Sequence, residues 1–209
     1  MISMWSGRAI LALAAILAPA NFLNAALSTP DGVPAPISLA GQLLIASPSM
    51  GDPRFDHTVI LVVRHSPSGA LGLVINRPIG ERPIASLLEM VGAADRSVTG
   101  TVPVFAGGPV QPQTGFVIHS TDYRRSDTID IDGHVAVTSS AGILRDMGSN
   151  KGPKKSLVAF GYAGWGAGQL EDELAHGVWL TAPEEPGLVF DENRQKVWER
   201  AWSHRTQDL

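Results

Sequence analysis

The chain contains no cysteine. Without a thiol it can form no disulfide, no thiolate zinc site and no cysteine nucleophile, in whatever compartment it resides. Its function therefore does not rest on sulfur chemistry of that kind.

Positive charge is also scarce. Lys and Arg number 16 against 20 Asp and Glu, which gives a formal net charge of −4 at pH 7. Sequence-independent binding to nucleic acid depends on clustered Lys and Arg that neutralise phosphates. The basic groups that do occur, Arg124–Arg125 and Lys151–Lys155, are small and fall in predicted loops. The sequence therefore disfavours direct binding to nucleic acid.

Catalytic and metal-binding signatures are missing as well. No G-x-S-x-G motif is present, so no serine has the context of a nucleophile elbow. The six His residues include no H-x-H or H-E-x-x-H spacing, which a local zinc site would show. We therefore predict no catalytic residue, no metal site and no cofactor.

What the chain does have is the composition of a globular domain with many turns. Apolar residues make up 44% and charged residues 17%, and there are 22 glycines and 15 prolines. Short apolar runs rich in Val, Ile and Leu, separated by Gly, Pro, Ser and Asp, indicate strands. The predicted strands are 41–47, 58–64, 70–76, 102–106, 115–120, 128–138, 154–164, 178–182 and 187–190.

Helices interrupt these strands singly. Apolar residues at positions 84, 87, 88 and 91 follow the i, i+3, i+4, i+7 pattern of an amphipathic helix. Further helices are predicted over 139–149, where Ser139 or Ser140 can cap the N-terminus, over 169–177, and over 191–205. This order is too irregular for a doubly wound fold. It predicts a single α+β domain with a large mixed β-sheet packed with helices.

The first residues resemble a secretory signal. Arg8 precedes an apolar run from Ala9 to Leu17, followed by small residues that allow cleavage after Ala20 or Ala25. The run is too short for a comfortable transmembrane span, so we expect no transmembrane helix in the mature protein. We predict a signal peptide over 1–25, a flexible linker over 26–38, and a folded domain over 39–209. The protein would then be periplasmic or secreted; the alternative is a cytoplasmic protein with a misassigned start.

Three glycine- or proline-rich stretches are candidates for a ligand- or partner-binding site. The first is Asn76–Arg77–Pro78, where polar side chains at a strand end can offer donors to a carboxylate or phosphate. The second is Gly107–Gly108–Pro109, a turn that can leave backbone N–H groups free. Each can equally be a structural turn, with Arg77 pairing with a local acid such as Glu81.

The third stretch is GYAGWGAGQLEDEL, from Gly161 to Leu174. It is a poor phosphate cradle, because its glycine spacing is not G-x-G-x-x-G and three acidic residues occupy the first turn of the following helix. It is either a tight corner between a strand and a helix or one wall of a small-ligand pocket. The candidate wall residues are Tyr162, Gly164, Trp165, Gly166, Gly168 and Gln169.

These stretches, in this order, resemble the AlgH/YqgE family of bacterial proteins. The resemblance is carried by GQLLIASPSMGDPRFDHTVILVVRHSPSGALGLVINRP, VFAGGPVQPQTGFVIHS, GYAGWGAGQLEDEL with the following VWL, and LVFD with Trp198. It extends from about Leu39 to the end and implies a compact α+β domain with a split mixed sheet. The family carries a transcriptional-regulator label, but no catalytic residues that could be carried over to this chain.

The sequence therefore predicts a non-enzymatic binding or regulatory protein whose ligand is a small molecule or a protein partner. An exported protein could regulate transcription only indirectly. The alternative is a hydrolase-like enzyme that uses His65 or His119 as a base beside a glycine-rich pocket.

The signal-peptide prediction is tested by fractionating the native host and measuring the intact mass of the protein. We expect loss of about 20 to 25 residues and recovery from the periplasm. A full-length chain, or one that starts near Leu39, recovered from the cytosol would contradict it.

Overall fold

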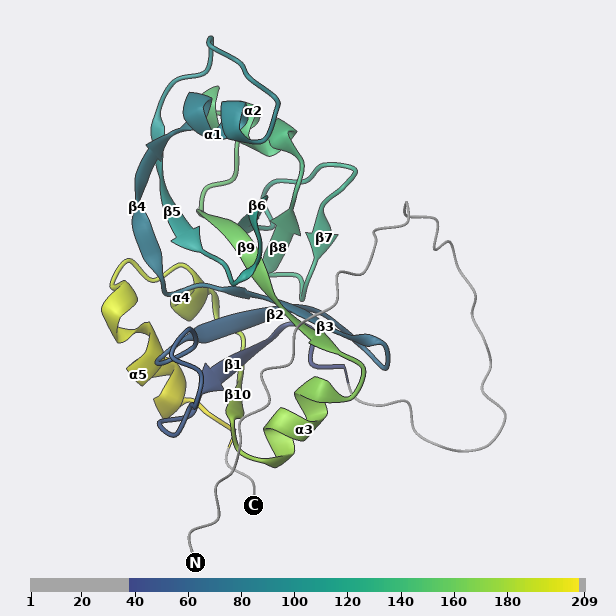
Figure 1. Cartoon of the computed structure of the whole chain (residues 1–209). Helices are drawn as coiled ribbons and strands as arrows, with labels where there is room; N and C mark the ends of the chain where they lie inside the picture. Colours follow the sequence, from purple (N-terminus) through teal and green to yellow (C-terminus); the bar gives the residue numbers. More distant parts are fainter. Residues whose placement is uncertain (1–37, 207–209) are drawn as a thin grey trace, which may run out of the picture. The chain divides into compact units, whose positions relative to one another are not determined.

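The computed structural model describes residues 38–206. The predicted signal peptide and nearly all of the predicted linker lie outside the described residues. The described part folds as one α+β unit, a large curled sheet of ten strands with five α-helices (Figure 1). None of the helices in it is long and apolar enough to cross a membrane.

The elements follow one another in a mixed order, as the sequence predicts. Their bounds are β1 Gln42–Ala46, β2 Val59–Ser66, β3 Gly69–Val74, β4 Pro78–Pro83, α1 Ile84–Met90, β5 Thr101–Ala106, β6 Val110–Ser120, β7 Ile129–Asp130, β8 Val135–Thr138, α2 Ala141–Gly148, β9 Ser156–Gly166, α3 Gln169–Ala175, β10 Trp179–Pro183, α4 Pro186–Val189, the 3₁₀ helix η1 Arg194–Lys196, and α5 Val197–Ser203.

The sheet runs in the order β10-β1-β2-β3-β9-β6-β8-β7, and every pair on this path is antiparallel. A branch leaves this path at β9, where β5 pairs in parallel with β9 and β4 pairs with β5. The long strand β9 therefore joins both parts of the sheet. Near its end β9 pairs with β3. Near its start it pairs with β6 along one edge and with β5 along the other.

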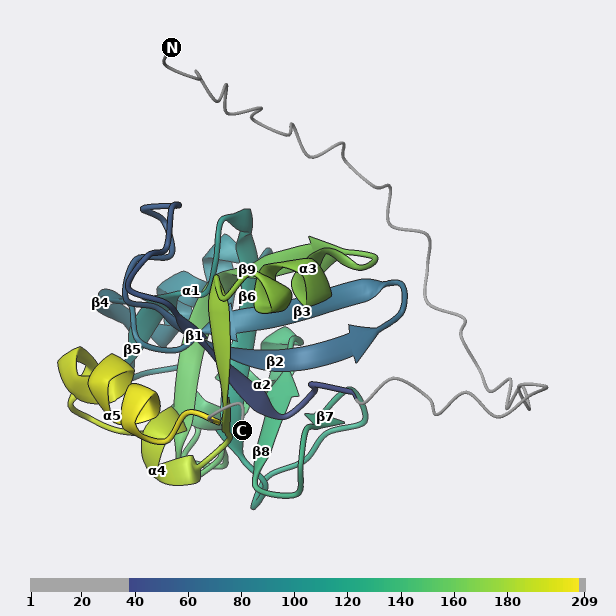
Figure 2. The ribbon, with the colours of Figure 1, turned by 90° about the horizontal axis from the view of Figure 1, so that it is seen from below.

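The central strands β1 and β2 are buried on both faces, which explains their uninterrupted apolar sequences. Side chains alternate between the faces of a strand. Leu43 and Leu61 accordingly pack in one cluster with Val197 of α5, whereas Leu44 and Ile60 pack in another with Leu170 of α3. Figure 2 shows α4 and α5 on one side of these strands and α3 on another. At the far end of the molecule, α1 and α2 pack against each other (Figure 1).

Four details of the predicted elements are wrong. The stretch 187–190, predicted as a strand, is the helix α4, because Pro186 fits the first turn of a helix. The predicted strand 128–138 is divided by a turn into β7 and β8. The strand β4 was not predicted at all. Ser140 does occupy the N-cap of α2, but its hydroxyl makes no capping hydrogen bond and is buried without a partner in the described part of the chain.

Two glycine stretches meet where β5 leaves β9. The N–H of Gly107 donates to the carbonyl of Phe160 at 2.7 Å, and the carbonyl of Gly107 accepts from the N–H of Val74 at 2.9 Å. A Cβ atom at Gly107 would clash with the carbonyl oxygen of Gly161, and one at Gly108 would clash with the backbone of Tyr162. Three chain segments therefore pass so closely that only glycine fits. We call this point the glycine crossing.

The crossing can be tested by comparing two Gly→Ala variants. Neither Gly107 nor Gly51 has a positive φ, but a Cβ at Gly51 meets nothing within 4 Å. We expect Gly107→Ala to lower the free energy of unfolding by about 1–3 kcal/mol through overpacking. Gly51→Ala should leave it unchanged or raise it by about 0.5 kcal/mol. Equal stability of the two variants in urea unfolding would contradict the steric argument.

Candidate functional site

Asn76 and Arg77 fix the end of β3 against the loop that precedes β2. The side-chain oxygen of Asn76 accepts from the N–H of Val59, and its amide donates to the carbonyl of His57, both at 2.9 Å. Arg77 donates to the carbonyl of Asp56 at 2.8 Å, so its partner is a backbone group and not Glu81. The polar groups of Asn76 and Arg77 that were candidates for binding a ligand therefore bond to the backbone of the same chain. Pro78 lines a surface cleft.

The structure brings two of the predicted stretches together and leaves the third partly separate. The N–H of Ala106 donates to the carbonyl of Arg77 at 2.9 Å, which places the Asn76–Pro78 stretch beside the glycine crossing. Gly107–Pro109 and Tyr162 lie at the crossing itself. The rest of the third stretch lies towards the far end of β9, where Gly168 takes a left-handed conformation at the N-cap of α3.

That far corner is organised around the carboxylate of Glu173. The indole N–H groups of Trp165 and Trp179 both donate to one of its oxygens, at 2.8 and 2.7 Å, and the amide of Gln169 donates to the other at 2.9 Å. The side-chain oxygen of Gln169 in turn accepts from the N–H of Gly166 at 3.2 Å. This stretch therefore forms the strand, corner and helix that the sequence predicted. Whether any of the twelve candidate residues binds a ligand stays a prediction.

His65 is held by two hydrogen bonds. Its Nδ1 accepts from the N–H of Leu39 at 3.1 Å, so its Nε2 carries the proton and donates to Glu171 at 2.7 Å. The imidazole is 6% exposed. The backbone N–H of Glu171 and then His65 lower the pKa of that carboxyl group. Since both ring nitrogens are occupied, no lone pair on His65 is free to act as a base in this arrangement.

His119 is fully buried in a directed chain of hydrogen bonds. Its Nδ1 must donate to the carbonyl of Ser120, at 2.9 Å, so its Nε2 accepts from the hydroxyl of Thr138, also at 2.9 Å. The hydroxyl of Thr138 then accepts from Thr128, which accepts from the N–H of Arg125. Burial lowers the pKa of His119 and favours this neutral form. The role of His119 in the described structure is thus to satisfy buried polar groups.

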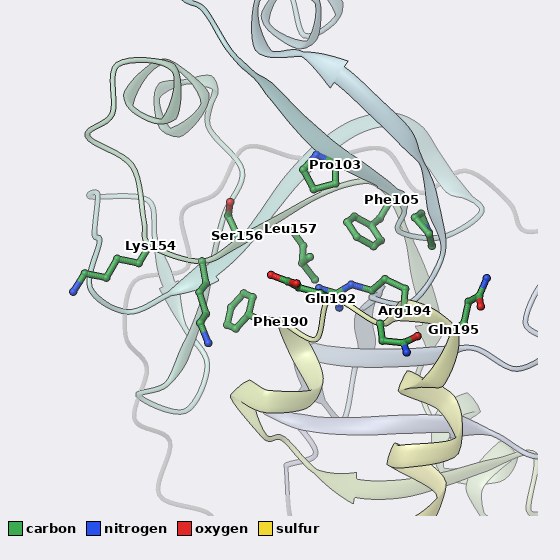
Figure 3. Close-up of a pocket in the computed structure, with 12 residues that line it drawn as sticks. Pro103, Phe105, Lys154, Ser156, Leu157, Phe190, Glu192, Arg194 and Gln195 are labelled. Carbon is green, nitrogen blue, oxygen red and sulfur yellow. The ribbon is translucent and has the colours of Figure 1, made fainter.

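A cleft of about 770 Å³ lies at the surface between β5, the start of β9 and the segment after α4. This volume is within the usual range for ligand sites. In Figure 3, Phe105 and Arg194 lie on one side of Leu157, and Phe190 lies on its other side. Lys154 extends outwards. The lining residues are Pro78, Pro103, Phe105, Lys154, Lys155, Ser156, Leu157, Phe190, Glu192, Asn193, Arg194 and Gln195. Only Pro78 was among the candidates from the sequence.

Arg194 is the most constrained charge in the cleft. Its guanidinium lies 5.2 Å from the centre of the Phe105 ring and donates one hydrogen bond, of 2.7 Å, to the carbonyl of Val189. Burial lowers its pKa to about 10, and the charge of Glu192 opposes that shift. Within residues 38–206 it forms no salt bridge. A partly buried cation with donors left over is suited to binding an anion.

The cleft could not be predicted from the sequence because its residues come from four distant segments. Arg194 was assigned to the charged face of a C-terminal helix, but it begins η1, and the helix α5 starts only at Val197. Lys154 and Lys155 were noted as part of a small basic group and as the start of a predicted strand, not as part of a cleft. Nothing in the spacing of these residues indicates that the fold brings them together.

A pair of carboxyl groups is formed by Asp132 of the β7–β8 turn, which is exposed, and Glu184, which is half-buried just before α4. Both side-chain oxygens of Glu184 are buried and receive no hydrogen bond from the described residues. Burial, and then the neighbouring Asp132, raise the pKa of Glu184 to about 8. Asp132 has a lowered pKa despite the desolvation of its own carboxyl group, because Glu184 lies beside it and the N–H groups of Val135 and His134 donate to it. At neutral pH Glu184 therefore holds a proton.

The described residues contain no group of three or more His, Asp or Glu that could hold a metal ion. The fold and the site together define a single-domain α+β protein with a half-barrel sheet and an open, mainly cationic cleft. The AlgH-like family (DUF179) matches residues 43–209. The chain belongs to this family.

Relatives and solved structures agree with this assignment. A UPF0301 protein of Jannaschia sp. is 48% identical over 165 residues, which cover 78% of this chain and 86% of that protein. The solution structure of the AlgH protein from Pseudomonas aeruginosa has a TM-score of 0.69 and 38% identity, covering 83% of this chain and 92% of its own. A crystal structure of a Corynebacterium diphtheriae protein, at 22% identity and a TM-score of 0.59, shares the fold. The names of these three proteins state no activity.

The carboxyl pair predicts a pH dependence of stability. Because the pKa of Glu184 is raised to about 8 in the folded protein, the folded state binds more protons than the unfolded state between the ordinary pKa of Glu and that value. The free energy of unfolding should therefore fall as the pH rises from about 4.5 to about 8. Glu184→Gln should remove part of this fall, and at pH 8 it should be more stable than the unsubstituted protein by about 1 kcal/mol.

Urea unfolding at pH 5 and pH 8 measures this difference. Glu89→Gln is the matched control, because Glu89 is exposed on α1 and does not contribute to the shift of Glu184. The prediction fails if both substitutions change the pH dependence equally.

Proposed function

We propose that this protein is a non-enzymatic binding protein and that its ligand, an anion with an apolar part, occupies the cleft between β5, β9 and the segment after α4. The observation that carries the proposal is Arg194, a partly buried cation without a salt bridge in the described part of the chain. Removing such a charge from water costs free energy, which a bound anion offsets. Binding would then serve regulation, and any effect on transcription would be indirect if the protein is periplasmic.

The charges around the cleft support this choice of ligand. Lys154, Lys155 and Arg194 line it with one opposing carboxylate, Glu192, although the whole chain carries a net charge of −4. A local excess of positive charge on an acidic protein favours anions at this place over the rest of the surface. Phe190, which is partly exposed, offers apolar area for the remainder of the ligand, and the nearly buried Phe105 and Leu157 complete the apolar lining.

The enzymatic alternative receives no comparable support. It requires His65 or His119 to accept a proton beside a glycine-rich pocket, and both ring nitrogens of each residue already form hydrogen bonds. Neither residue lines the cleft.

The proposal is tested with phenyl phosphate, which combines a ring with an anion, in an NMR titration of the labelled protein. We expect shifts at Phe105, Leu157 and Phe190. The variant Arg194→Met keeps an apolar stem and removes the charge, and should weaken binding about tenfold, the value of one charge-assisted hydrogen bond.

Two controls make the result specific. Arg96→Met removes an equal charge from an exposed site outside the cleft and should not change the affinity. Benzyl alcohol, which lacks the anion, should bind more weakly than phenyl phosphate. If no shifts occur at the cleft at millimolar phenyl phosphate, or if the two Arg variants behave alike, the proposed site is wrong.

A further inference from the structure

The cleft lies at a fork in the sheet. The strands β5 and β9 pair only from Val104 and Val158 onwards. Before that point β5 pairs with β4, and β9 pairs with β6 on its other edge. Pro103 and Ser156, the residues that flank the fork on the two strands, both line the cleft. The cleft is therefore bordered by the unpaired edge of the first two residues of β9, Ser156 and Leu157, in addition to side chains.

The direction of the backbone groups on β9 follows from two hydrogen bonds. Ser120 donates its N–H to the carbonyl of Lys155 at 3.0 Å, so the backbone of Lys155 faces β6. Successive residues of a strand direct these groups to opposite edges, so the N–H and carbonyl of Ser156 face β5. The carbonyl of Phe160, four residues further along, does face that edge and accepts from Gly107.

The residue that would pair with Ser156 is a proline. In the parallel pairing of Ala106 with Phe160, the N–H of the next residue, Gly107, is the donor to Phe160. By the same register Val102 lies opposite Ser156, and the donor to its carbonyl would be Pro103. Proline has no N–H group. The sequence thus ends the parallel pairing at this position and leaves the carbonyl of Ser156 directed towards the fork.

We propose that this fork receives an extended, acidic peptide segment of a partner protein, which pairs with the exposed edge of β9 as an additional strand. The inference rests on the proposed function, since it names the ligand of the same cleft. The N–H of the peptide donates to the carbonyl of Ser156, and acidic side chains meet Lys155 and Arg194. Alternate apolar side chains of the peptide lie against the partly exposed Phe190.

The outer edge of β4 is less suited to this role. All six residues of β4 are exposed, but the strand begins with Pro78, ends with Pro83, and has an irregular register between Pro78 and Gly80. Prolines and irregular pairing protect an edge from strand addition. The fork combines the edge of β9 at Ser156, which has no such protection, with cationic side chains and apolar lining residues.

The test uses a short, acetylated and amidated peptide in which Asp alternates with Val, titrated into the labelled full chain. Two further versions carry N-methyl groups on the odd or on the even amides, which removes donors without changing charge. Because only alternate amides of a strand face one neighbour, we expect one methylated version to bind about tenfold more weakly and the other to change less. The largest shifts should occur at Ser156 and Val158.

Protein variants separate the side-chain contribution. Arg194→Met and the exposed Lys155→Met should each weaken peptide binding, whereas Arg96→Met should not; the Lys155 variant keeps the test valid if the Arg194 variant does not fold. A peptide in which Lys alternates with Val should not bind.

The outcomes distinguish this inference from the proposed function. If phenyl phosphate binds at the cleft but the acidic peptide does not, or if both methylated versions bind as well as the unmodified peptide, strand addition is wrong and the anion site stands. If neither probe binds, both proposals fall.

Discussion

The structure depends on the close approach of three backbone segments at the glycine crossing. There β3, the end of β5 and the middle of β9 are joined by hydrogen bonds to Gly107, with no side chain between them. The crossing lets β9 continue from one part of the sheet to the other while β5 branches away from it. A side chain at this point would push the strands apart and weaken the closure of the curled sheet around its core.

Much of this fold can be predicted from the sequence, because strand alternation and helix periodicity are local properties. The strands β2 and β3, the helix α1 and the unit of β9 and α3 were all predicted on that basis. The exceptions have physical causes. The exposed strand β4 carries no hydrophobic pattern, and α4 is a single turn whose apolar residues are equally compatible with a strand.

The candidate site is less predictable, because it depends on where distant segments meet. Glycines after strands suggest exposed backbone groups, but here they allow the backbone to approach itself closely, and their hydrogen bonds are used internally. The cleft instead forms where a proline interrupts parallel pairing and a C-terminal arginine packs on a phenylalanine. Neither event has a signature in the local sequence.

The composition of the cleft also bears on how far a ligand can be inferred between relatives. Phe105 is a core residue, whereas Lys154, Lys155 and Glu192 are exposed. The charge of the cleft can thus change without disturbing the core. Two proteins with this fold and the same apolar lining of the cleft can therefore select ligands of opposite charge. Residues 154, 155, 192 and 194 are therefore the positions to compare before a binding partner found for one member is assigned to another.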